Sequence, residues 1–253
     1  KYIKYSDNPK FYLLSLFNYN FKMLNNIYKF LGKIESSAFK KLRINENISI
    51  NNYFFLIIKG FFSILESIIR NISGPFGYIL RRYYYKMVFN KMGNDVLIDV
   101  GVVFNGAQNI TCGNKVWIDS YSTFSLQIGE LYIGNQVHIH SHTFFGGRDK
   151  IIIEDEAGIS SGSRLFTSGI SIMPRDKKLI NPMIDVYDPT AINAGPITIK
   201  KNAMVLSNCV ISPNITIGEG SILLSCSFLT KSTPKYSIFI GTPAVQIGER
   251  PKD

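Results

Sequence analysis

The chain has 253 residues, of which 28 are Lys or Arg and 18 are Asp or Glu, so its formal net charge is +10. Hydrophobic residues make up 45% of it and charged residues 18%, a balance that excludes wholesale disorder because enough apolar surface is available for a core. Residues 1–90 hold 14 basic and 4 acidic side chains, whereas residues 91–253 hold 14 of each. We therefore expect two regions, a basic N-terminal region over 1–90 and a second domain over 91–253.

The N-terminal region is aromatic-rich and is predicted to be α-helical. It contains 21 of the 33 Phe, Tyr and Trp residues. Its most apolar stretch, 54–69, includes Lys59 and Glu66 and falls short of the roughly 20 apolar residues that a bilayer span needs. No apolar run with a cleavage site follows the basic start, so no signal peptide is expected. Apolar residues at helical spacing predict one broad apolar face, made by Phe54, Phe55, Ile58, Phe61, Phe62, Leu65 and Ile69.

Three roles fit a basic, aromatic helical region. Nucleic-acid binding uses basic and stacking side chains together, but no nucleic-acid motif accompanies them here, so no nucleic-acid partner is expected. Amphipathic helices with Lys, Arg and aromatic residues also dock on anionic membrane surfaces. A helical segment can instead cap the open end of a neighbouring domain. Docking and capping are compatible, and both stay open.

From residue 199 onward, aliphatic residues repeat at an unbroken interval of six: Ile199, Val205, Ile211, Ile217, Leu223 and Leu229. The same register runs backwards as triplets that start at residues 92, 112, 133 and 153, so one repeat takes 20 or 21 residues. It breaks after Leu165, which predicts a loop of roughly 28 residues before 199. A six-residue interval drifts off any α-helical face. It is typical of a solenoid whose coils have three short parallel strands, with the aliphatic residues inside.

Small residues and glycines are placed for the corners of such a solenoid. Gly-Asn pairs at 93–94, 113–114 and 134–135 are predicted to supply positive φ at turns. The three cysteines, Cys112, Cys209 and Cys226, lie far apart without a CxxC, which argues against a disulfide framework or a zinc ribbon. We expect them to be small buried apolar side chains.

The register resembles that of the hexapeptide-repeat acyltransferases over residues 70 to 250, most of all the O-acetyltransferases of polysaccharide gene clusters. The segments that carry the resemblance are Gly74-Pro-Phe-Gly77 with Leu80-Arg-Arg82, Ile133-Gly-Asn-Gln-Val-His-Ile139, Gly158-Ile-Ser-Ser161, Asn181-Pro-Met183, Gly195-Pro-Ile-Thr-Ile199 and residues 234–244. The resemblance implies a mainly β fold, a left-handed parallel β-helix of about six coils with a long loop at 168–196, behind an α-helical N-terminal region. It further implies a homotrimer with active sites between subunits, and a loop that shapes the acceptor pocket with residues such as Arg175 and Tyr187.

The activity implied is acetyl transfer from acetyl-CoA to a sugar hydroxyl of a bacterial-type surface polysaccharide, such as a capsule, or of its precursor. Two alternatives remain: N-acetylation of a nucleotide-linked amino sugar, and a non-catalytic β-helix that serves as a binding or structural module. One departure keeps the last alternative open, because Ser168-Gly169 stands where the maltose-acetyltransferase branch has its catalytic histidine. We expect a cytoplasmic protein, peripheral to the inner face of the membrane if the basic region docks there.

All three histidines of the chain, His138, His140 and His142, lie within five residues. If Ile139 points inward, strand alternation turns His138 and His140 outward, and His142 should also face outward. Histidine suits the removal of a hydroxyl proton, because its ordinary pKa of roughly 6.5 lies near working pH. We predict a catalytic role for at least one of them, and the resemblance favours His138. A subunit contact and a zinc site are the alternatives; no acidic ligand is adjacent in sequence, so no metal is expected.

The resemblance places coenzyme A in the groove between neighbouring subunits, along the late coils. Cations suited to its phosphates are Lys200, Lys201, Lys231 and Lys235. Other candidate contacts come from backbone groups near Ser207, Ser225, Gly241, Thr242, Pro243 and Ala244.

Overall fold

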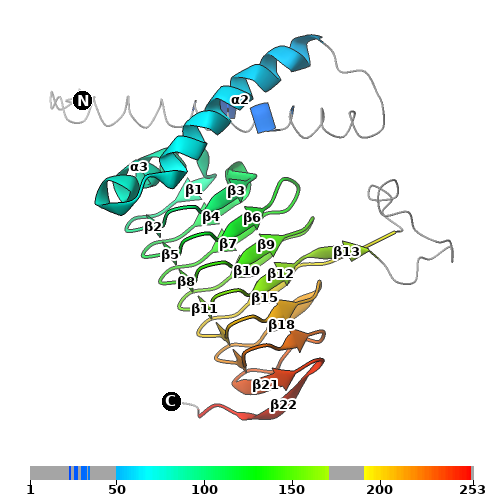
Figure 1. Cartoon of the computed structure of the whole chain (residues 1–253). Helices are drawn as coiled ribbons and strands as arrows, with labels where there is room; N and C mark the ends of the chain where they lie inside the picture. Colours follow the sequence, from blue (N-terminus) through cyan, green and yellow to red (C-terminus); the bar gives the residue numbers. More distant parts are fainter. Residues whose placement is uncertain are drawn as a thin grey trace, which may run out of the picture.

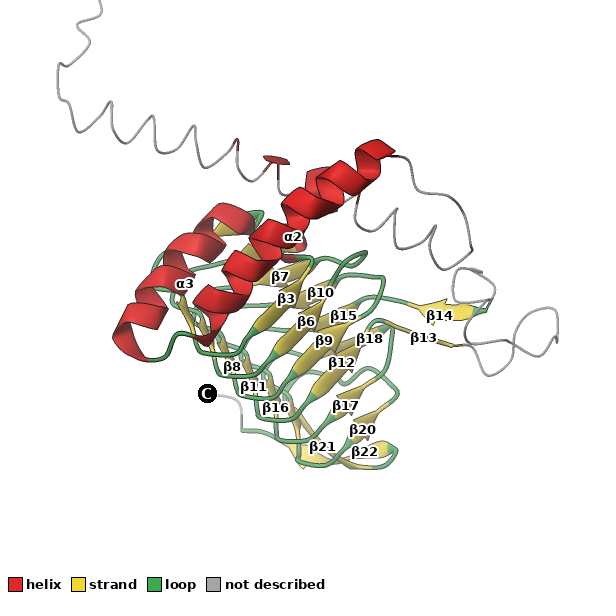
Figure 2. Cartoon of the chain, turned by 45° about the horizontal axis from the view of Figure 1, so that its top comes forward, coloured by secondary structure: helices red, strands yellow, loops and turns green. Residues whose placement is uncertain are grey.

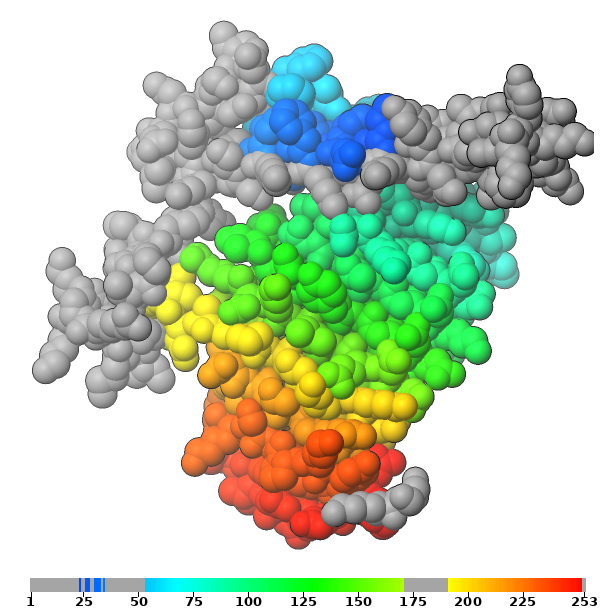
Figure 3. Space-filling model, turned by 180° about the vertical axis from the view of Figure 1, so that it is seen from behind, coloured from blue at the N-terminus to red at the C-terminus, as the bar shows by residue number. Residues whose placement is uncertain are grey.

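The computed structural model describes residues 50–170 and 191–251, together with Met23, Asn26, Ile27, Phe30, Leu31, Gly32 and Ile34 of a preceding helical segment. Figure 1 shows helices α2 (Ile50–Asn71) and α3 (Gly74–Val88) at one end of a stack of coils. The chain advances along this stack, so successive coils form successive bands of colour in Figure 3. The predicted helical region and solenoid are thus both observed.

The solenoid has three faces, each a mainly parallel sheet. Face A contains β1 (Lys91–Met92), β4 (Ile110–Cys112), β7 (Leu131–Ile133), β10 (Ile151–Ile153), β15 (Ile197–Ile199) and β18 (Ile215–Ile217). Face B contains β2 (Leu97–Ile98), β5 (Trp117–Ile118), β8 (His138–Ile139), β11 (Gly158–Ile159), β16 (Met204–Val205), β19 (Ile222–Leu223), β21 (Ser237–Gly241) and the antiparallel β22 (Ala244–Glu249). Face C contains β3 (Val103–Asn105), β6 (Thr123–Ser125), β9 (Phe144–Gly146), β12 (Arg164–Phe166), β17 (Val210–Ile211) and β20 (Phe228–Leu229).

The six-residue register is confirmed as the inner wall of this left-handed β-helix. Ile199, Val205 and Ile211 have no exposed surface, nor do the three aliphatic residues that continue their series. Strand β10 pairs in parallel with β15, matching Ile153 with Ile199 across the predicted loop. Near the N-terminal end the inner column is aromatic, and the rings of Phe104, Phe124 and Phe145 stack with centroids 4.8 Å apart. Adjacent coils therefore share one continuous core.

The predicted role of the Gly-Asn pairs is wrong in its detail. Positive φ is adopted not by the pair but by the following residue, Asp95, Lys115 or Gln136. The glycines are needed for close approach instead, since a Cβ at Gly93 would lie 2.4 Å from the carbonyl oxygen of Gly113. The asparagines make a ladder along the corner, in which each side chain accepts a hydrogen bond from the backbone N–H of the coil before it.

Helix α3 closes the first coil of the solenoid. Its side chains Tyr84, Tyr85 and Val88 belong to the same buried core as the inner residues of the coils. The fully buried Arg81 donates from Nε to the carbonyl of Ile98 over 2.8 Å and from Nη1 to that of Ile72 over 2.5 Å. Arg81 thus joins the carbonyls that follow α2 to the first strand of face B, as a cap requires.

The predicted apolar face of α2 is divided by packing: Phe62 and Ile69 lie against the core, whereas Phe54, Phe61 and Leu65 are exposed. The helix packs on α3 and Phe30 with the side that carries Phe55, and two of its three charged residues, Lys59 and Glu66, are also buried. Glu66 accepts a hydrogen bond from Tyr85 over 3.3 Å. Because the buried charges occupy the inner side, an apolar stripe is left exposed on the outer side: Phe54, Ile57, Phe61, Ile64 and Ile68. No helix among the described residues is long and apolar enough to cross a bilayer.

The long loop starts and ends as an antiparallel arm, β13 (Ser168–Ile170) with β14 (Ile192–Ala194). Figures 1 and 2 show this arm projecting sideways from the coils. Residues 171–190, with Arg175, Tyr187 and the Asn181-Pro-Met183 segment, lie outside the described residues. Cys112 and Cys209 are buried as predicted, but the prediction is wrong for Cys226, which is exposed at a corner with φ of 61°.

Candidate functional site

The side chains of the three histidines point in two directions from one short segment. Ile139 is fully buried, and His138 and His140 face outward on either side of it at face B, as alternation predicts. His142 has a φ of 59° at the next corner and is exposed, with its ring stacked on Tyr121 at a centroid distance of 5.5 Å. The structure therefore brings His138 and His140 together and places His142 around the corner from them.

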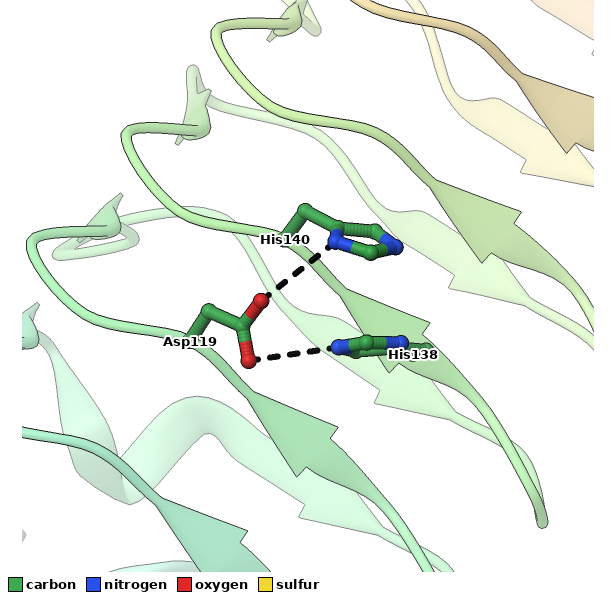
Figure 4. Close-up of side chains that lie close together, drawn as sticks. All are labelled: Asp119, His138 and His140. Carbon is green, nitrogen blue, oxygen red and sulfur yellow. Dashed lines mark hydrogen bonds and ion pairs between the residues drawn. The ribbon is translucent and has the colours of Figure 1, made fainter.

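Asp119 joins the two histidines of face B. It follows β5, the strand that pairs with β8 in face B. Because Trp117 pairs with His138, Asp119 lies next to His140, two residues further along in both coils. One carboxylate oxygen lies 3.2 Å from Nε2 of His138 and the other lies 3.4 Å from Nδ1 of His140 (Figure 4). The contact with His138 is a hydrogen bond, in which Nε2 donates because an ionised carboxylate only accepts, whereas the contact with Nδ1 of His140 is an ion-pair distance. We call Asp119, His138 and His140 the histidine–aspartate cluster.

The electrostatic setting keeps His140 in its neutral form. Burial lowers its pKa below the ordinary value, and the neighbouring charge of His138 lowers it further, against the raising effect of Asp119. Nδ1 is the ring nitrogen that faces Asp119 at 3.4 Å, so the tautomer with its proton on Nδ1 is favoured and leaves the lone pair on Nε2. Neutral His140 can therefore accept a proton at neutral pH.

The cluster also has the composition of a divalent-metal site, since its ligand atoms all lie within 4.8 Å of one another. An imidazole nitrogen binds a metal in the plane of its ring. The two rings are nearly stacked, with centroids 3.8 Å apart and planes tilted by 31°, so their lone pairs do not converge well on one point. This arrangement suits two hydrogen bonds to the two oxygens of one carboxylate better than a shared zinc ion.

Open space, which we call the recess, adjoins the cluster at Gly158 on face B. The outward row of side chains runs from Trp117, stacked on His138 at 4.8 Å, through Gly158 to Met204. Gly158 has no positive φ, and a Cβ there would have no heavy atom within 4 Å. Neither backbone conformation nor packing requires this glycine, and its missing side chain leaves His138 open on that side.

Helix α3 lies beside the neighbouring row of outward residues, which contains Asp99 and Asp119. The hydroxyl of Tyr78 hydrogen bonds to Asp99, which occupies one coil earlier the position that Asp119 occupies. Burial and then this hydrogen bond raise the pKa of Tyr78. The cap of the solenoid therefore ends beside the carboxylates of the candidate site.

The corner that carries His142 opens into a cavity of about 410 Å³. It is lined by Tyr121, Thr123, His142, Thr143, Phe144, Arg164 and Phe166. We call it the corner pocket. The histidine–aspartate cluster and the corner pocket thus lie on the two sides of one edge of the solenoid.

The predicted coenzyme A residues are spread over the late coils and do not meet in one pocket. Three of the lysines are paired, Lys200 with Glu154 at 2.6 Å, Lys201 with Glu156 at 3.6 Å and Lys235 with Glu219 at 2.8 Å, while Lys231 is exposed. Ser207 and Ser225 lie at the corner between faces B and C, and Gly241, Thr242, Pro243 and Ala244 form the turn between β21 and β22. Their role in binding coenzyme A stays a prediction.

Asp119, Tyr121, Gly158 and Arg164 are the residues that sequence reasoning missed. A signal for Asp119 existed, because it lies 21 residues before His140, which is one coil length. Applying the repeat to polar residues as well as to aliphatic ones predicts that they are neighbours. Arg164 gives no such signal, since its position at a pocket depends on the shape of the corner.

No family model matches the chain. It is 28% identical over 167 residues to the dTDP-4-amino-4,6-dideoxy-D-glucose acyltransferase of Escherichia coli, which covers 66% of this chain and 85% of the relative. It is 25% identical over 174 residues to WcaF of Escherichia coli K12, an acetyltransferase assigned to colanic acid biosynthesis, with 68% of this chain and 76% of the relative covered.

Among solved structures, AntD of Bacillus cereus has a similar fold, with a TM-score of 0.60 and 26% identity over 68% of this chain and 90% of AntD. AntD is an N-acyltransferase, and this structure of an AntD variant contains dTDP and coenzyme A. The chain is a homologue of the hexapeptide-repeat acyltransferases. The comparisons thereby confirm the similarity of the chain to this family and the fold that it implies, and they support an acyltransferase activity.

Proposed function

We propose that this hexapeptide-repeat protein is an acetyl-CoA-dependent O-acetyltransferase that modifies a sugar hydroxyl of a bacterial-type surface polysaccharide or of its nucleotide-linked precursor. The observation that carries the proposal is the histidine–aspartate cluster, in which a carboxylate orients two outward-facing imidazoles beside the open recess at Gly158. A hydroxyl acceptor needs a base at the moment of attack, and an oriented neutral imidazole supplies one.

We assign the base to Nε2 of His140. As the acceptor hydroxyl attacks the thioester carbonyl, its proton passes to Nε2, and the resulting imidazolium is stabilised by Asp119. The C–S bond then breaks, and the sulfur leaves with the proton returned by His140, which gives the acetyl ester and free coenzyme A. His138, which the resemblance favours, binds the same carboxylate through Nε2 and would help to hold Asp119 in place.

N-acylation of a nucleotide-linked amino sugar is the second candidate. It is favoured by two relatives, the Escherichia coli acyltransferase named for such a sugar and the N-acyltransferase AntD. A neutral amine is itself a nucleophile, so this reaction would depend less on His140 than ester formation does.

The decisive experiment measures acetyl transfer from acetyl-CoA to three sets of acceptors: capsular and O-antigen glycans, neutral sugar nucleotides, and amino-sugar nucleotides. His140→Ala should lower kcat for a hydroxyl acceptor by about 10²-fold or more, and His142→Ala by far less. Turnover near wild type in His138→Ala, His140→Ala and His142→Ala alike would contradict a histidine base. Absence of coenzyme A binding at millimolar concentration would contradict both acylation reactions and leave a non-catalytic module.

The donor and the assembly follow the same proposal. Coenzyme A would lie along the late coils of face B. Its phosphates could replace Glu154 or Glu219 as the partners of the exposed lysines, because surface ion pairs stabilise by less than about 1 kcal/mol. The open side of the cluster would be covered by a neighbouring subunit of a homotrimer. Sedimentation of the full chain tests the assembly.

We also propose that α2 and α3 dock on an anionic membrane surface. The apolar stripe of α2 continues in the exposed Phe76, Ile79 and Tyr83 of α3, and Ile57 and Phe61 are 72% and 71% exposed. Residues 1–90 carry the whole excess of positive charge of the chain, which complements anionic headgroups. Docking would hold the enzyme near acceptors carried by lipids.

A further inference from the structure

The corner pocket has a lining that differs from the rest of the solenoid surface. Two pairs of rings form its walls, Tyr121 with His142 and Phe144 with Phe166, at centroid distances of 5.5 Å in both pairs. Thr123, Phe144 and Arg164 follow one another in the row of outward residues on β6, β9 and β12. The pocket therefore combines aromatic faces, a hydroxyl and one cation.

Arg164 is available to a ligand. Its side chain is exposed, and no carboxylate pairs with it within residues 50–170 and 191–251. Most of the lysines of the late coils, by contrast, are paired with glutamates. A guanidinium without an acidic partner binds phosphate oxygens with two parallel hydrogen bonds.

The rings of the pocket occupy positions that their neighbours leave to glycine. Tyr121 and His142 have φ of 61° and 59°, whereas Gly101 and Gly162 take positive φ at the same corner in the coils before and after them. Aromatic residues seldom adopt this conformation, which is unfavourable for a side chain with a Cβ. Tyr121 lies over Gly101 of the preceding coil, and this packing places its ring beside that of His142 in the pocket.

Aromatic faces bind planar bases by stacking, and Arg binds phosphates. The volume of about 410 Å³ falls in the range of pockets for small ligands. We propose that the corner pocket is a binding site for a nucleoside diphosphate, whose base stacks among the rings and whose phosphates meet Arg164.

The pocket lies where such a group would be useful. Tyr121 follows Asp119 by two residues, and His142 follows His140 by two, so one edge of the solenoid separates pocket and cluster. A nucleoside diphosphate held there can extend an attached group around this edge to His140. Two molecules contain a nucleoside diphosphate, a nucleotide-activated acceptor sugar and coenzyme A itself. Only the choice between them rests on the proposed function.

The test is calorimetric titration of the full chain with dTDP, UDP and coenzyme A, each alone. Arg164→Gln and Tyr121→Ala should each weaken binding of the pocket's ligand about tenfold or more. Lys91→Ala, which removes an exposed cation on face A, is the control and should leave binding unchanged. Melting temperatures close to that of the wild type show that each variant is folded.

The titrations also identify the source of the nucleoside diphosphate. Loss of dTDP or UDP binding in the two variants, with coenzyme A binding intact, assigns the pocket to the acceptor. Loss of coenzyme A binding alone assigns it to the donor. If neither changes, or if no nucleoside diphosphate binds the wild type, the proposal is overturned.

Activity separates this proposal from the proposed function. With a nucleotide-linked acceptor, Arg164→Gln should raise KM about tenfold and change kcat little, because the contact is made equally in the ground and transition states. Nucleotide binding without acetyl transfer would contradict the proposed enzymatic function, but the proposal for the corner pocket would stand. Acetyl transfer with unchanged KM values for both the sugar nucleotide and acetyl-CoA in Arg164→Gln would overturn the pocket and leave the enzyme.

Discussion

Asp119 determines what the two histidines of face B can do. One carboxylate oxygen accepts a hydrogen bond from His138 and the other lies 3.4 Å from Nδ1 of His140, so one residue of the preceding coil faces both rings. Without it the rings, stacked at 3.8 Å, would repel each other once both were protonated. The carboxylate therefore favours the tautomer of His140 that leaves Nε2 available.

The substitution Asp119→Asn should lower kcat/KM about 10- to 100-fold, since the orienting charge is lost while the size of the side chain is kept. Asp119 raises the pKa of His140 against burial and His138, so removing its charge lowers that pKa further. The acidic limb of the kcat/KM profile, measured from pH 5 to 9, should move to lower pH. Asp95→Asn removes an exposed carboxylate that pairs only with Arg82 at 3.7 Å, and should leave the profile unchanged.

Filling the recess beside His138 should affect activity and leave the fold intact. A Cβ at Gly158 meets nothing within 4 Å, so Gly158→Val should fold with an unchanged or slightly higher melting temperature. Its branched side chain would occupy the approach to the cluster, and kcat/KM should fall about tenfold or more. Gly248→Val, in β22 with equal free space, is the matched control. Full activity in Gly158→Val would show that substrates approach from elsewhere.

At the scale of elements, α3 links the helices to the coils. The guanidinium of Arg81 is buried among the carbonyls of Ile69, Arg70 and Ile72 and that of Ile98. Burial lowers the pKa of Arg81, but an arginine stays protonated at any working pH. Its hydrogen bonds therefore hold the end of α2 on face B, where Tyr78 of α3 adjoins the site.

Replacing Arg81 with Met should lower the free energy of unfolding by about 2–4 kcal/mol, because several buried carbonyls lose their donor. Arg82→Met, next in the sequence but 41% exposed, should change it by less than about 1 kcal/mol. Urea denaturation followed by circular dichroism measures both. Equal stability of the two variants would mean that water replaces Arg81 as the donor.

At the scale of the whole molecule, anchoring and chemistry occupy separate places. The apolar stripe lies on the helices at one end of the stack (Figures 1 and 2), whereas the cluster and the corner pocket are built from residues of its second, third and fourth coils. Docking through α2 would thus leave the candidate site exposed to the aqueous phase. The positive charge of residues 1–90 would determine where the protein is held, and the second domain, whose charges balance, would perform the chemistry.

Liposome flotation of the full chain tests docking. The wild type should float with vesicles rich in anionic lipid and much less with zwitterionic ones, and high salt should weaken the association. The double variant Ile57→Asp and Phe61→Asp should lose about tenfold or more of the bound fraction, and Ser63→Asp, elsewhere on α2, far less. Failure to float, with concentration-dependent self-association through the same residues, would assign the stripe to a second copy of the chain.

The sequence predicted the fold well because a solenoid is built from local repeats. Each aliphatic residue of the register needs only its counterpart one coil away, so its burial follows from spacing alone. The same logic predicts outward-facing His138 and His140. It says less about α2, where Phe62 and Ile69 of the predicted apolar face pack against the core but Phe54, Phe61 and Leu65 are exposed.

By itself, then, the sequence determined the β-helix, the position of the long loop and the segment that carries every histidine, because these depend on periodicity along the chain. Only the tertiary structure decided that His140 shares Asp119 with His138, that His142 belongs to a different pocket, and that Arg164 lies there without an acidic partner. These relations join residues of different coils and faces. Their distances depend on how the corners fold, which no spacing in the sequence specifies.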